Sequence, residues 1–470
     1  MTIKESAPCE GTQSCPAASG EKARLTALET VYEVLEKGRY ANLALEHALR
    51  ASTLNWADRH LVTEIVNGTV RMVRHLDWVL DLFLTKPVSK QQPWIRNVLR
   101  ISLYQLRFMD RIPAYACVDD AVKLATRKAG RKLAAVVNGV LRNYLRSPEK
   151  VHFPAEDHLQ HMALRYSYPD WLVEEFARLV DNSELEELLS YLNSPPPVVA
   201  RVNRLKVDKP GLLDRLRQER VRAEAGRYTP WSIHIRELKQ PVSELNSYGE
   251  GLFYLQNEGS MLAAAILDPP PEGLVYDLGA GVGGKSTHMA EWMNDQGRII
   301  AVELHAHKLG LLKANCQRLG IKSVQPLQSD ITTLGPALPL AERVLLDAPC
   351  SGWGVLNRRA DARWRLSQEA VTNLPELQFR LLQAAAGLLK AGGLLLYSTC
   401  TINPAENEQV IARFLQAAPF ELQGFAENIG FFPLTAEDSE KARRGCLTLM
   451  PGRYHCDGMF YALMRRKGHE

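Results

Sequence analysis

The sequence predicts a multidomain protein with an all-helical N-terminal domain, a small α+β module and a C-terminal α/β domain built on a parallel sheet. Between residues 21 and 147, apolar residues recur at three- and four-residue spacing, which is the pattern of amphipathic helices. Three consecutive prolines at 195–197 mark a boundary, and strand-like segments follow them. From residue 251 onward, short apolar runs alternate with helical patterns, as in a parallel sheet with crossover helices.

A length of 470 residues exceeds what one hydrophobic core usually supports, so several domains are expected. Cys9 and Cys15, near the N-terminus, could pair or bind a metal, but their spacing matches no standard zinc motif, and we predict no metal site. The expected domains are a disordered tail (1–20), a helical domain (21–150), a helical linker with the small module (151–250) and a catalytic domain (251–470).

The composition is that of a soluble globular protein, with 46% apolar and 23% charged residues. No apolar run approaches the length that spans a bilayer, and no secretion signal is recognised, so we expect no membrane association. Eight cysteines are scattered along the chain, which favours a reducing, cytoplasmic setting. We expect a monomer.

The positive charge is concentrated in the helical domain. Lys and Arg outnumber Asp and Glu there by 22 to 13 between residues 21 and 150, whereas the rest of the chain is net negative. A basic domain on a mildly acidic body indicates a surface that faces nucleic acid; the alternative is a well-solvated helical surface. Four of the basic residues cluster on one late helix: Arg127, Lys128, Arg131 and Lys132.

A glycine-rich loop follows the predicted strand 274–278 and precedes a helix, the context in which such a loop binds a nucleotide-like ligand. Glu303 ends the next strand, where a carboxylate can accept hydrogen bonds from both ribose hydroxyls. This arrangement suits a dinucleotide or S-adenosylmethionine. The rival interpretation is a phosphate-binding loop of the Gly-x4-Gly-Lys-Ser type; Asp347, the one candidate for its magnesium ligand, is followed at once by Ala-Pro-Cys. The loop residues are Gly279, Ala280, Gly281, Val282, Gly283, Gly284 and Lys285.

Two cysteines follow two predicted strands of the same sheet. Cys350 comes shortly after the strand 344–346, and Cys400 ends the strand that begins at residue 394. Ligands bind beyond the carboxyl ends of parallel strands, so both thiols are expected at one edge with the glycine loop. A thiolate that adds to carbon 6 of cytosine turns carbon 5 into a nucleophile that can attack a methyl sulfonium. The alternative is that the cysteines only pack in the core.

Three short runs resemble the signatures of RNA (cytosine-5) methyltransferases: residues 347–354 (Asp-Ala-Pro-Cys-Ser-Gly-Trp-Gly), 398–401 (Ser-Thr-Cys-Thr) and 406–408 (Glu-Asn-Glu). The segment 255–260 resembles the family's run before the cofactor loop. Runs at 41–45, 58–59 and 63–71 resemble the NusB-like RNA-binding fold. Together, the chain resembles the Sun/RsmB family of 16S rRNA (cytosine-5) methyltransferases, with a NusB-like domain, an RRM-like module and a Rossmann-like catalytic domain.

The resemblance implies S-adenosyl-L-methionine as cofactor and 16S rRNA as substrate, with a target of the cytosine 967 type. It implies that Cys400 is the nucleophile and that Cys350 assists proton removal or product release. DNA enzymes of this chemistry use the cysteine of the Pro-Cys motif, which would move the nucleophile to Cys350. The remaining implied site residues surround the cofactor or the base: Lys285, Glu303 (ribose), Lys308, Asp330 (adenine amine) and Asp347 (pyrimidine edge or methionine part).

An arginine-rich loop is expected to bind RNA by clamping phosphates and stacking a base. Its residues are Arg358, Arg359, Arg363 and Trp364. The alternative is an arginine-rich surface turn. Nearby, Ala360 stands where the family commonly has proline, which changes the expected shape of this loop.

The cofactor loop departs from the family pattern Asp-x-Cys-Ala-Ala-Pro-Gly-Gly-Lys-Thr. Gly279, Gly281 and Val282 replace Cys, Ala and Pro, and bring the loop nearer to the general methyltransferase pattern. We therefore expect cofactor binding to be kept. Two other functions stay open: a tRNA (cytosine-5) methyltransferase, and a non-catalytic RNA-binding or ribosome-assembly factor with a degenerate methyltransferase domain.

Overall fold

The structure is a computed structural model that describes residues 16–154, 156–335 and 338–468. It divides into two compact units: the chain up to Leu179 together with Arg359–Trp364, and Val180–Arg358 together with Arg365 onward. Cys9, Cys15 and the first fifteen residues of the expected tail lie outside the described residues. The first helix begins at Pro16, earlier than the boundary at residue 21 that the sequence suggests.

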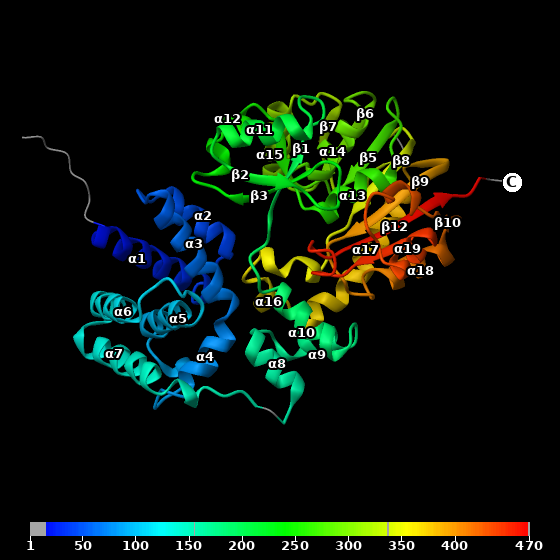
Figure 1. Cartoon of the computed structure of the whole chain (residues 1–470). Helices are drawn as coiled ribbons and strands as arrows, with labels where there is room; N and C mark the ends of the chain where they lie inside the picture. The colour runs from blue at the N-terminus through cyan, green and yellow to red at the C-terminus, as the bar shows by residue number, and fades with distance from the viewer. Residues whose placement is uncertain (1–15, 155, 336–337, 469–470) are drawn as a thin grey trace, which may run out of the picture. The chain divides into compact units, whose positions relative to one another are not determined.

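The first unit is entirely helical (Figure 1). Its central helix, α5, packs against α1, α3, α4, α6 and α7 and is buried on most of its circumference. Pro93 and the side chain of Gln92, which accepts a hydrogen bond from Ile95 N, start this helix. The helices are α1 (Pro16–Leu35), α2 (Ala41–Arg50), α3 (Trp56–Arg71), α4 (Val73–Asp81), α5 (Pro93–Phe108), α6 (Ala114–Ala129), α7 (Arg131–Arg146), α8 (His158–Tyr166) and α9 (Asp170–Ala177).

A six-residue segment from much later in the chain, Arg359–Trp364, completes this helical unit. The carboxylate of Asp361 accepts a hydrogen bond from the backbone N–H of Ala41, the first residue of α2, at 3.1 Å, although the two residues are 320 positions apart. The side chain of Tyr40, the N-cap residue, makes no capping hydrogen bond to α2. A carboxylate near a helix N-terminus stabilises that end, so Asp361 supplies from a distance what the local sequence lacks.

The second unit contains a small four-stranded antiparallel sheet in the order β2-β3-β1-β4, with α11 packed against it. This is the α+β module that the sequence predicts. Its own core holds Leu212 and Leu216 of α11 against Ile233 of β3. The elements are α10 (Asn182–Tyr191), β1 (Val198–Val202), α11 (Lys209–Gln218), β2 (Arg222–Ala225), β3 (Ser232–Glu237), α12 (Asn246–Gly249) and β4 (Phe253–Leu255).

The larger sheet of this unit has the order β10-β12-β9-β8-β5-β6-β7, and β11 pairs with β12. The strands β9, β8, β5, β6 and β7 run parallel, whereas β12 is antiparallel to β9. The elements are α13 (Glu258–Leu267), β5 (Leu274–Leu278), α14 (Gly284–Trp292), β6 (Arg298–Glu303), α15 (Ala306–Leu319), β7 (Val324–Gln328), β8 (Ala341–Asp347), α17 (Gln368–Ala386), β9 (Leu389–Thr399), α18 (Glu408–Ala417), β10 (Phe420–Leu422), α19 (Ala436–Arg443), β11 (Cys446–Leu449) and β12 (Met459–Arg466). The short helix α16 (Ala362–Arg365) falls, except for its last residue, in the segment that completes the helical unit.

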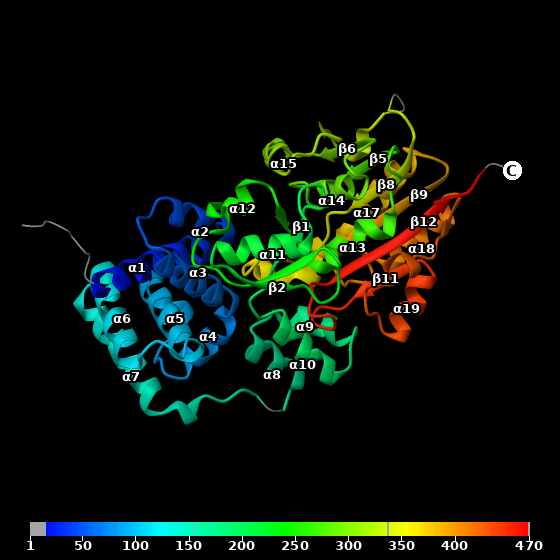
Figure 2. The ribbon, with the colours of Figure 1, turned by 45° about the horizontal axis from the view of Figure 1, so that its top comes forward.

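Helices cover both faces of this sheet (Figure 2). Val275 of β5 points into a core with α13, α14 and α15, while its neighbour Tyr276 points into a core with α17 and α18. This alternation is the two-residue period of a strand that is buried on both sides. The predicted multidomain fold with a parallel catalytic sheet is therefore confirmed. Among the described helices, none combines the length and apolar character that crossing a membrane requires.

Candidate active site

Three neighbouring strands of the larger sheet bring the predicted catalytic groups to one edge. The order β9-β8-β5 places Thr399, Asp347 and Leu278 at the carboxyl ends of adjacent parallel strands. Cys400 follows the first of these residues directly, the Pro-Cys turn follows the second, and the glycine loop follows the third. The geometry thus brings together residues that are up to 122 positions apart in the chain, Leu278 and Cys400.

The glycine loop adopts a backbone that side chains rarely tolerate. Gly279, Gly281 and Gly283 have φ angles of +81°, +57° and +91°. A Cβ atom on Gly279 would lie 2.4 Å from the carbonyl oxygen of Asp347, so a larger residue would force the loop away from β8. α14 begins at Gly284, so the last two residues of the loop form its first turn, and N–H groups of a helix N-terminus belong to the loop.

Two charged groups, Lys285 and Asp347, pair beside the loop, with 2.7 Å between Nζ and the carboxylate. The carboxylate of Asp347 also accepts a hydrogen bond from the Ser398 hydroxyl at 2.9 Å. Burial lowers the pKa of Lys285, but the nearby carboxylates of Asp347 and Asp277 outweigh this effect and leave its pKa raised. Lys285 is therefore a fixed positive charge at the floor of the site.

The carboxylate of Asp277, in β5, is completely buried. One of its oxygens accepts a hydrogen bond from Ser286 Oγ at 2.5 Å, and the other has no partner among the described residues. Burial raises its pKa to about 6, with a further contribution from Asp347. A buried carboxylate with an oxygen that has no partner is costly to ionise, and Asp277 lines the same cavity as the glycine loop.

We expect Asp277→Asn to stabilise the protein at pH 8 and to have little effect at pH 4. The folded-state pKa is raised from 3.8 to about 6, so the ionised carboxylate penalises folding. This penalty is absent below the unfolded pKa, grows as the pH rises between the two values, and is complete above pH 6. Asparagine cannot ionise, so the gain in free energy of unfolding at pH 8 is roughly 2–3 kcal/mol. Urea unfolding at both pH values measures it, and equal differences at pH 4 and pH 8 would contradict this assignment.

The two cysteines lie in contact, with 3.4 Å between the sulfurs of Cys350 and Cys400. The hydrogen bond to Cys400, then burial, raises the pKa of the Cys350 thiol. The backbone between them is fixed, because Gly354 N donates to Cys400 O at 3.0 Å and Gly352 has a φ of +69°. Such an arrangement suits one thiolate and one thiol, with Cys350 as the group that keeps its proton.

A buried carboxylate, Glu406, ties the two cysteine loops together. It accepts hydrogen bonds from Ser351 N at 2.9 Å and Ser351 Oγ at 2.5 Å, next to Cys350. It also accepts from Gln378 Nε2 at 2.9 Å and Asn403 Nδ2 at 3.0 Å. Glu406 is therefore a positioning residue for the Pro-Cys turn. The sequence pointed to it only as part of the run 406–408, with no role.

A cavity of about 500 Å³ runs from the glycine loop to Cys400. Residues Gly279–Val282, Gly284, Lys285, Asp277, Asp347 and Cys400 line it, which places most of the predicted loop in one space with the predicted nucleophile. Cys350 and Gly283 are not among the lining residues. Sequence reasoning missed several lining residues that come from the small module and the last strand: Pro196, Pro197, Val198, Val199, Tyr254, Asp457 and Met459.

Three further predicted cofactor residues, Glu303, Lys308 and Asp330, lie outside the lining of this cavity, and the first of them contacts the loop. Glu303 accepts hydrogen bonds from Gly281 N at 3.1 Å and from His305 N at 3.0 Å, and Lys308 Nζ lies 3.3 Å away. Burial raises the pKa of Glu303, but the hydrogen bonds from His305 and the charge of Lys308 outweigh it and lower the pKa overall. Asp330 is exposed and accepts hydrogen bonds from Thr332 Oγ1 at 2.7 Å and from Thr332 N at 2.8 Å, and these lower its pKa.

The predicted RNA-binding loop divides in two. Arg358 pairs with Asp457 and lines the cavity, and Arg359 is exposed, so both can face a ligand. Arg363, in contrast, is 0% exposed and lies over the ring of Tyr168 at 3.9 Å. Trp364 donates from Nε1 to the carbonyl of Val70 at 2.8 Å. The prediction that Arg363 and Trp364 clamp phosphates and stack a base does not fit these positions, because both side chains are packed inside the helical unit.

Comparison with known proteins assigns all three parts of the chain. A family model described as "16S rRNA methyltransferase RsmB/F" matches residues 264–465, a NusB family model matches 21–146, and an RsmF/B-like ferredoxin-like domain model matches 168–243. A probable ribosomal RNA small subunit methyltransferase B from Synechocystis is 36% identical over 94% of this chain and 99% of its own length. The chain belongs to the RsmB/F family of 16S rRNA methyltransferases.

Two further relatives agree with this membership. A probable ribosomal RNA small subunit methyltransferase B from Bacillus subtilis is 34% identical, over 94% of this chain and 98% of its own length. The crystal structure of a protein named PH0851 superposes with a TM-score of 0.78 at 26% identity, and covers 96% of this chain and 99% of that one. The RsmB/F family resemblance, the NusB-like domain and the Rossmann-like catalytic domain are thus confirmed.

The cofactor of this methyltransferase family is S-adenosyl-L-methionine, and the residues of the cavity fit it. The loop of positive-φ glycines leaves room for close approach of a ligand, and Asp277, one of whose carboxylate oxygens has no partner among the described residues, lines the same cavity. Glu303 at the end of β6 is placed beside Gly281 to accept from ribose hydroxyls. Among residues 16–468, apart from the undescribed positions, no group of three or more His, Cys, Asp or Glu side chains could hold a metal ion.

Proposed function

We propose that this 16S rRNA methyltransferase transfers the methyl group of S-adenosyl-L-methionine to carbon 5 of a cytosine, through a covalent bond between Cys400 and carbon 6. The observation that carries the proposal is the single cavity that the glycine loop and Cys400 share, with Cys350 in contact with Cys400. By resemblance, the target is of the cytosine 967 type.

In the proposed mechanism, the Cys400 thiolate adds to carbon 6 of the cytosine and pushes electron density to carbon 5. The bound cofactor supplies a methyl sulfonium, so carbon 5 gains the methyl group. Loss of the carbon 5 proton then lets the electrons return and expel the Cys400 thiolate, which restores the aromatic base. By resemblance, Cys350 assists proton removal or the release of Cys400; its sulfur lies 3.4 Å from that of Cys400, and the proton it retains favours the second role.

The assignment of Cys400 rather than Cys350 as nucleophile is supported by exposure and charge. Cys400 lines the cavity, whereas Cys350 does not. The raised pKa of Cys350 keeps that group as a thiol, and a thiol is a poorer nucleophile than a thiolate. The paired Lys285 and Asp347 line the same cavity as Cys400, and we expect Asp347 to hold the pyrimidine edge or the methionine part of the cofactor.

We further propose that the loop Gly279–Lys285, Glu303, Lys308 and Asp330 bind the cofactor, and that Arg358 and Arg359 contact RNA phosphates. Because Cys400 is only partly exposed inside a cavity, a stacked base cannot reach it, and we expect the target nucleotide to be turned out of its helix. An RNA complex with the target base still stacked would contradict this expectation.

The test is methyl transfer from labelled S-adenosyl-L-methionine to unmodified 16S rRNA, with unmodified tRNA beside it and nuclease digestion to identify the product. We expect label in 5-methylcytidine from 16S rRNA only. Label in tRNA alone would favour the tRNA-directed enzyme. An absence of transfer to either RNA, with RNA binding retained, would favour a non-catalytic assembly factor.

A further inference from the structure

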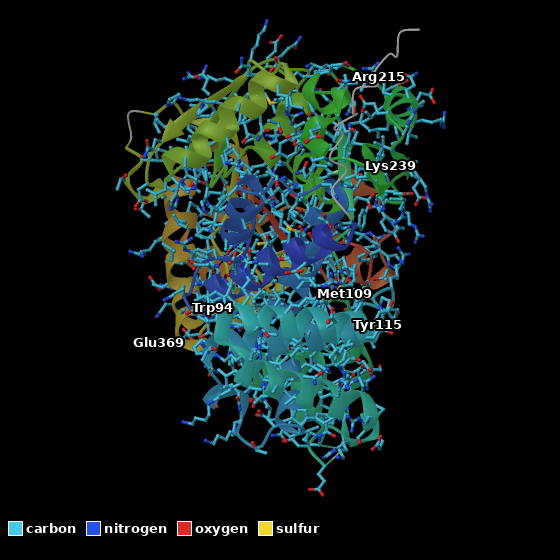
Figure 3. All side chains as sticks on the ribbon, turned by 90° about the vertical axis from the view of Figure 1, so that its left-hand side faces the viewer. Trp94, Met109, Tyr115, Arg215, Lys239 and Glu369 are labelled. Carbon is cyan, nitrogen blue, oxygen red and sulfur yellow. The ribbon has the colours of Figure 1, made fainter. Side chains whose placement is uncertain are left out.

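One face of the helical unit, formed by α6 and α7, has the chemistry of a nucleic-acid surface. The two helices are joined by the single residue Gly130, whose φ of +87° allows so tight a connection, and they lie side by side in Figures 1 and 2. Figure 3 views the unit from the side on which Tyr115 is labelled. Tyr115, at the start of α6, is 79% exposed, an unusual position for a large aromatic side chain with no packing role.

The charge of α7 is entirely positive. Its sixteen residues include no Asp or Glu and four basic residues, all exposed: Arg131, Lys132, Arg142 and Arg146. No ion pair joins any of these four to an acidic residue within the described ranges, whereas Lys123 and Lys128 of α6 pair with Asp119 and Glu29 at 2.7 Å. Unpaired cations on one helix face keep their full attraction for an external anion.

The aromatic and cationic groups converge on one cavity of about 590 Å³ between α6 and α7. Tyr115 lines it from α6, and Arg142, Leu145 and Arg146 line it from α7. Arg142 and Arg146 are one helical turn apart and therefore on the same side of α7. One acidic residue, Asp119, also lines this space, and its charge is countered by Lys123.

We propose that this α6–α7 face binds an unpaired stretch of RNA, with a base stacked on Tyr115 and phosphates held by Arg142 and Arg146. A cavity with an aromatic wall beside unpaired arginines matches the two components of single-stranded RNA, flat bases and a phosphate chain. A second copy of this chain is a poor occupant, because it would set four cations against four cations. The inference rests on the proposed function in taking rRNA as the partner, and it adds a second RNA contact apart from the methyl-transfer cavity.

The test compares the full-length wild type with the double variant Arg142→Glu, Arg146→Glu in binding unmodified 16S rRNA over a series of salt concentrations. We expect the Kd to rise at least about tenfold and the slope of log Kd against log salt to fall by about 1–2, because two phosphate contacts are lost. The matched control, Arg222→Glu with Lys239→Glu, makes the same charge change on the small module (Lys239 is labelled in Figure 3) and should change the Kd by less than about twofold.

The variant Tyr115→Ala separates stacking from charge. It should raise the Kd about tenfold and leave the salt slope unchanged, since no charge is removed. If the control double variant raises the Kd as much as Arg142→Glu, Arg146→Glu does, the effect is one of net charge and the proposal is overturned. A Kd equal to that of the wild type in every variant would also overturn it. Binding to vesicles that contain phosphatidylglycerol is measured for the same proteins. If the wild type binds these vesicles and the double variant does not, while both bind RNA equally, the face is a membrane surface and the proposal is overturned.

Methyl transfer by the same proteins keeps the two proposals distinguishable. If the face binds RNA, the double variant should raise KM for 16S rRNA and leave kcat at saturating RNA unchanged, because the cysteines are untouched. A wild type that binds RNA through this face but transfers no methyl group would refute the proposed reaction alone. If the wild type methylates 16S rRNA and the double variant has the same KM for this RNA, the proposal for the α6–α7 face alone is refuted.

Discussion

Replacing Cys400 by alanine is expected to abolish methyl transfer to 16S rRNA. Without a thiolate to add to carbon 6, carbon 5 of cytosine is too weak a nucleophile to accept the methyl group. Cys400 is the sulfur that lines the cavity, and no other sulfur among the described residues does so except that of Met459, which is a thioether and cannot form a thiolate. The measurement is incorporation of labelled methyl groups at saturating cofactor and RNA.

Replacing Cys350 by alanine is expected to have a different result, a covalent protein–RNA complex that survives denaturation. If Cys350 assists proton removal or release of Cys400, its loss leaves the bond to carbon 6 in place. Denaturing gel electrophoresis with labelled RNA detects the complex. The control is Cys446→Ala, which removes a partly buried thiol of β11 outside the site and should show full activity and no complex.

Activity that survives the loss of Cys400 but not the loss of Cys350 would move the nucleophile to the Pro-Cys turn. The 3.4 Å contact between the sulfurs makes Cys350 the competing nucleophile, because the two thiols lie side by side. A complex that forms in Cys350→Ala and is absent in the double variant with Cys400→Ala would assign the bond to Cys400.

The second large effect is expected from Glu406→Gln. The carboxylate receives four donated hydrogen bonds, from Ser351 N, Ser351 Oγ, Gln378 Nε2 and Asn403 Nδ2. An amide has one accepting oxygen, and its NH₂ group would face a donor. The free energy of unfolding should fall by about 1–3 kcal/mol, the cost of leaving a buried polar group unsatisfied.

Activity should fall further than stability alone explains, with kcat reduced roughly hundredfold, because a displacement of about 1 Å in a catalytic group has that effect. The KM for RNA should change little, since Glu406 is buried and touches no substrate. The matched control is Glu408→Gln. Glu408 lies two positions further along the chain, its side chain is exposed, and among the described residues it accepts a hydrogen bond only from Thr448 Oγ1, at 2.8 Å. If kcat falls only in proportion to the fraction of folded protein, Glu406 has a purely structural role and does not position the Pro-Cys turn for catalysis.

Much of the catalytic domain could be predicted from local pattern. The strand at 274–278 and the helix after the glycine loop were expected within a residue or two, since apolar runs, glycines and helical periodicity are local signals. The convergence of Asp347, Cys350 and Cys400 also followed from a general rule, because parallel strands end at one edge. The roles of these residues stay a proposal.

Other parts of the site depend on contacts that no local pattern records. β12 pairs antiparallel with β9, which brings Asp457, just before that strand, to Arg358 and the cavity. The sequence assigns Arg363 to a loop that clamps RNA phosphates, yet it is buried against Tyr168, and burial lowers its pKa to about 10. Only the tertiary position of Arg359–Trp364 distinguishes a packed arginine from one that binds phosphate.

The segment Arg359–Trp364 also sets an order of events during protein synthesis. The helical unit consists of residues up to Leu179 plus these six residues, so the ribosome finishes its first part long before its last. At about 5–20 residues per second, the interval is roughly 10–40 s. Throughout that time, the N–H of Ala41 lacks the Asp361 carboxylate, and the apolar side chains of Val34 and Val70 lack Ala360 and Trp364. The nascent helical unit therefore stays incomplete until about half of the catalytic domain has been translated.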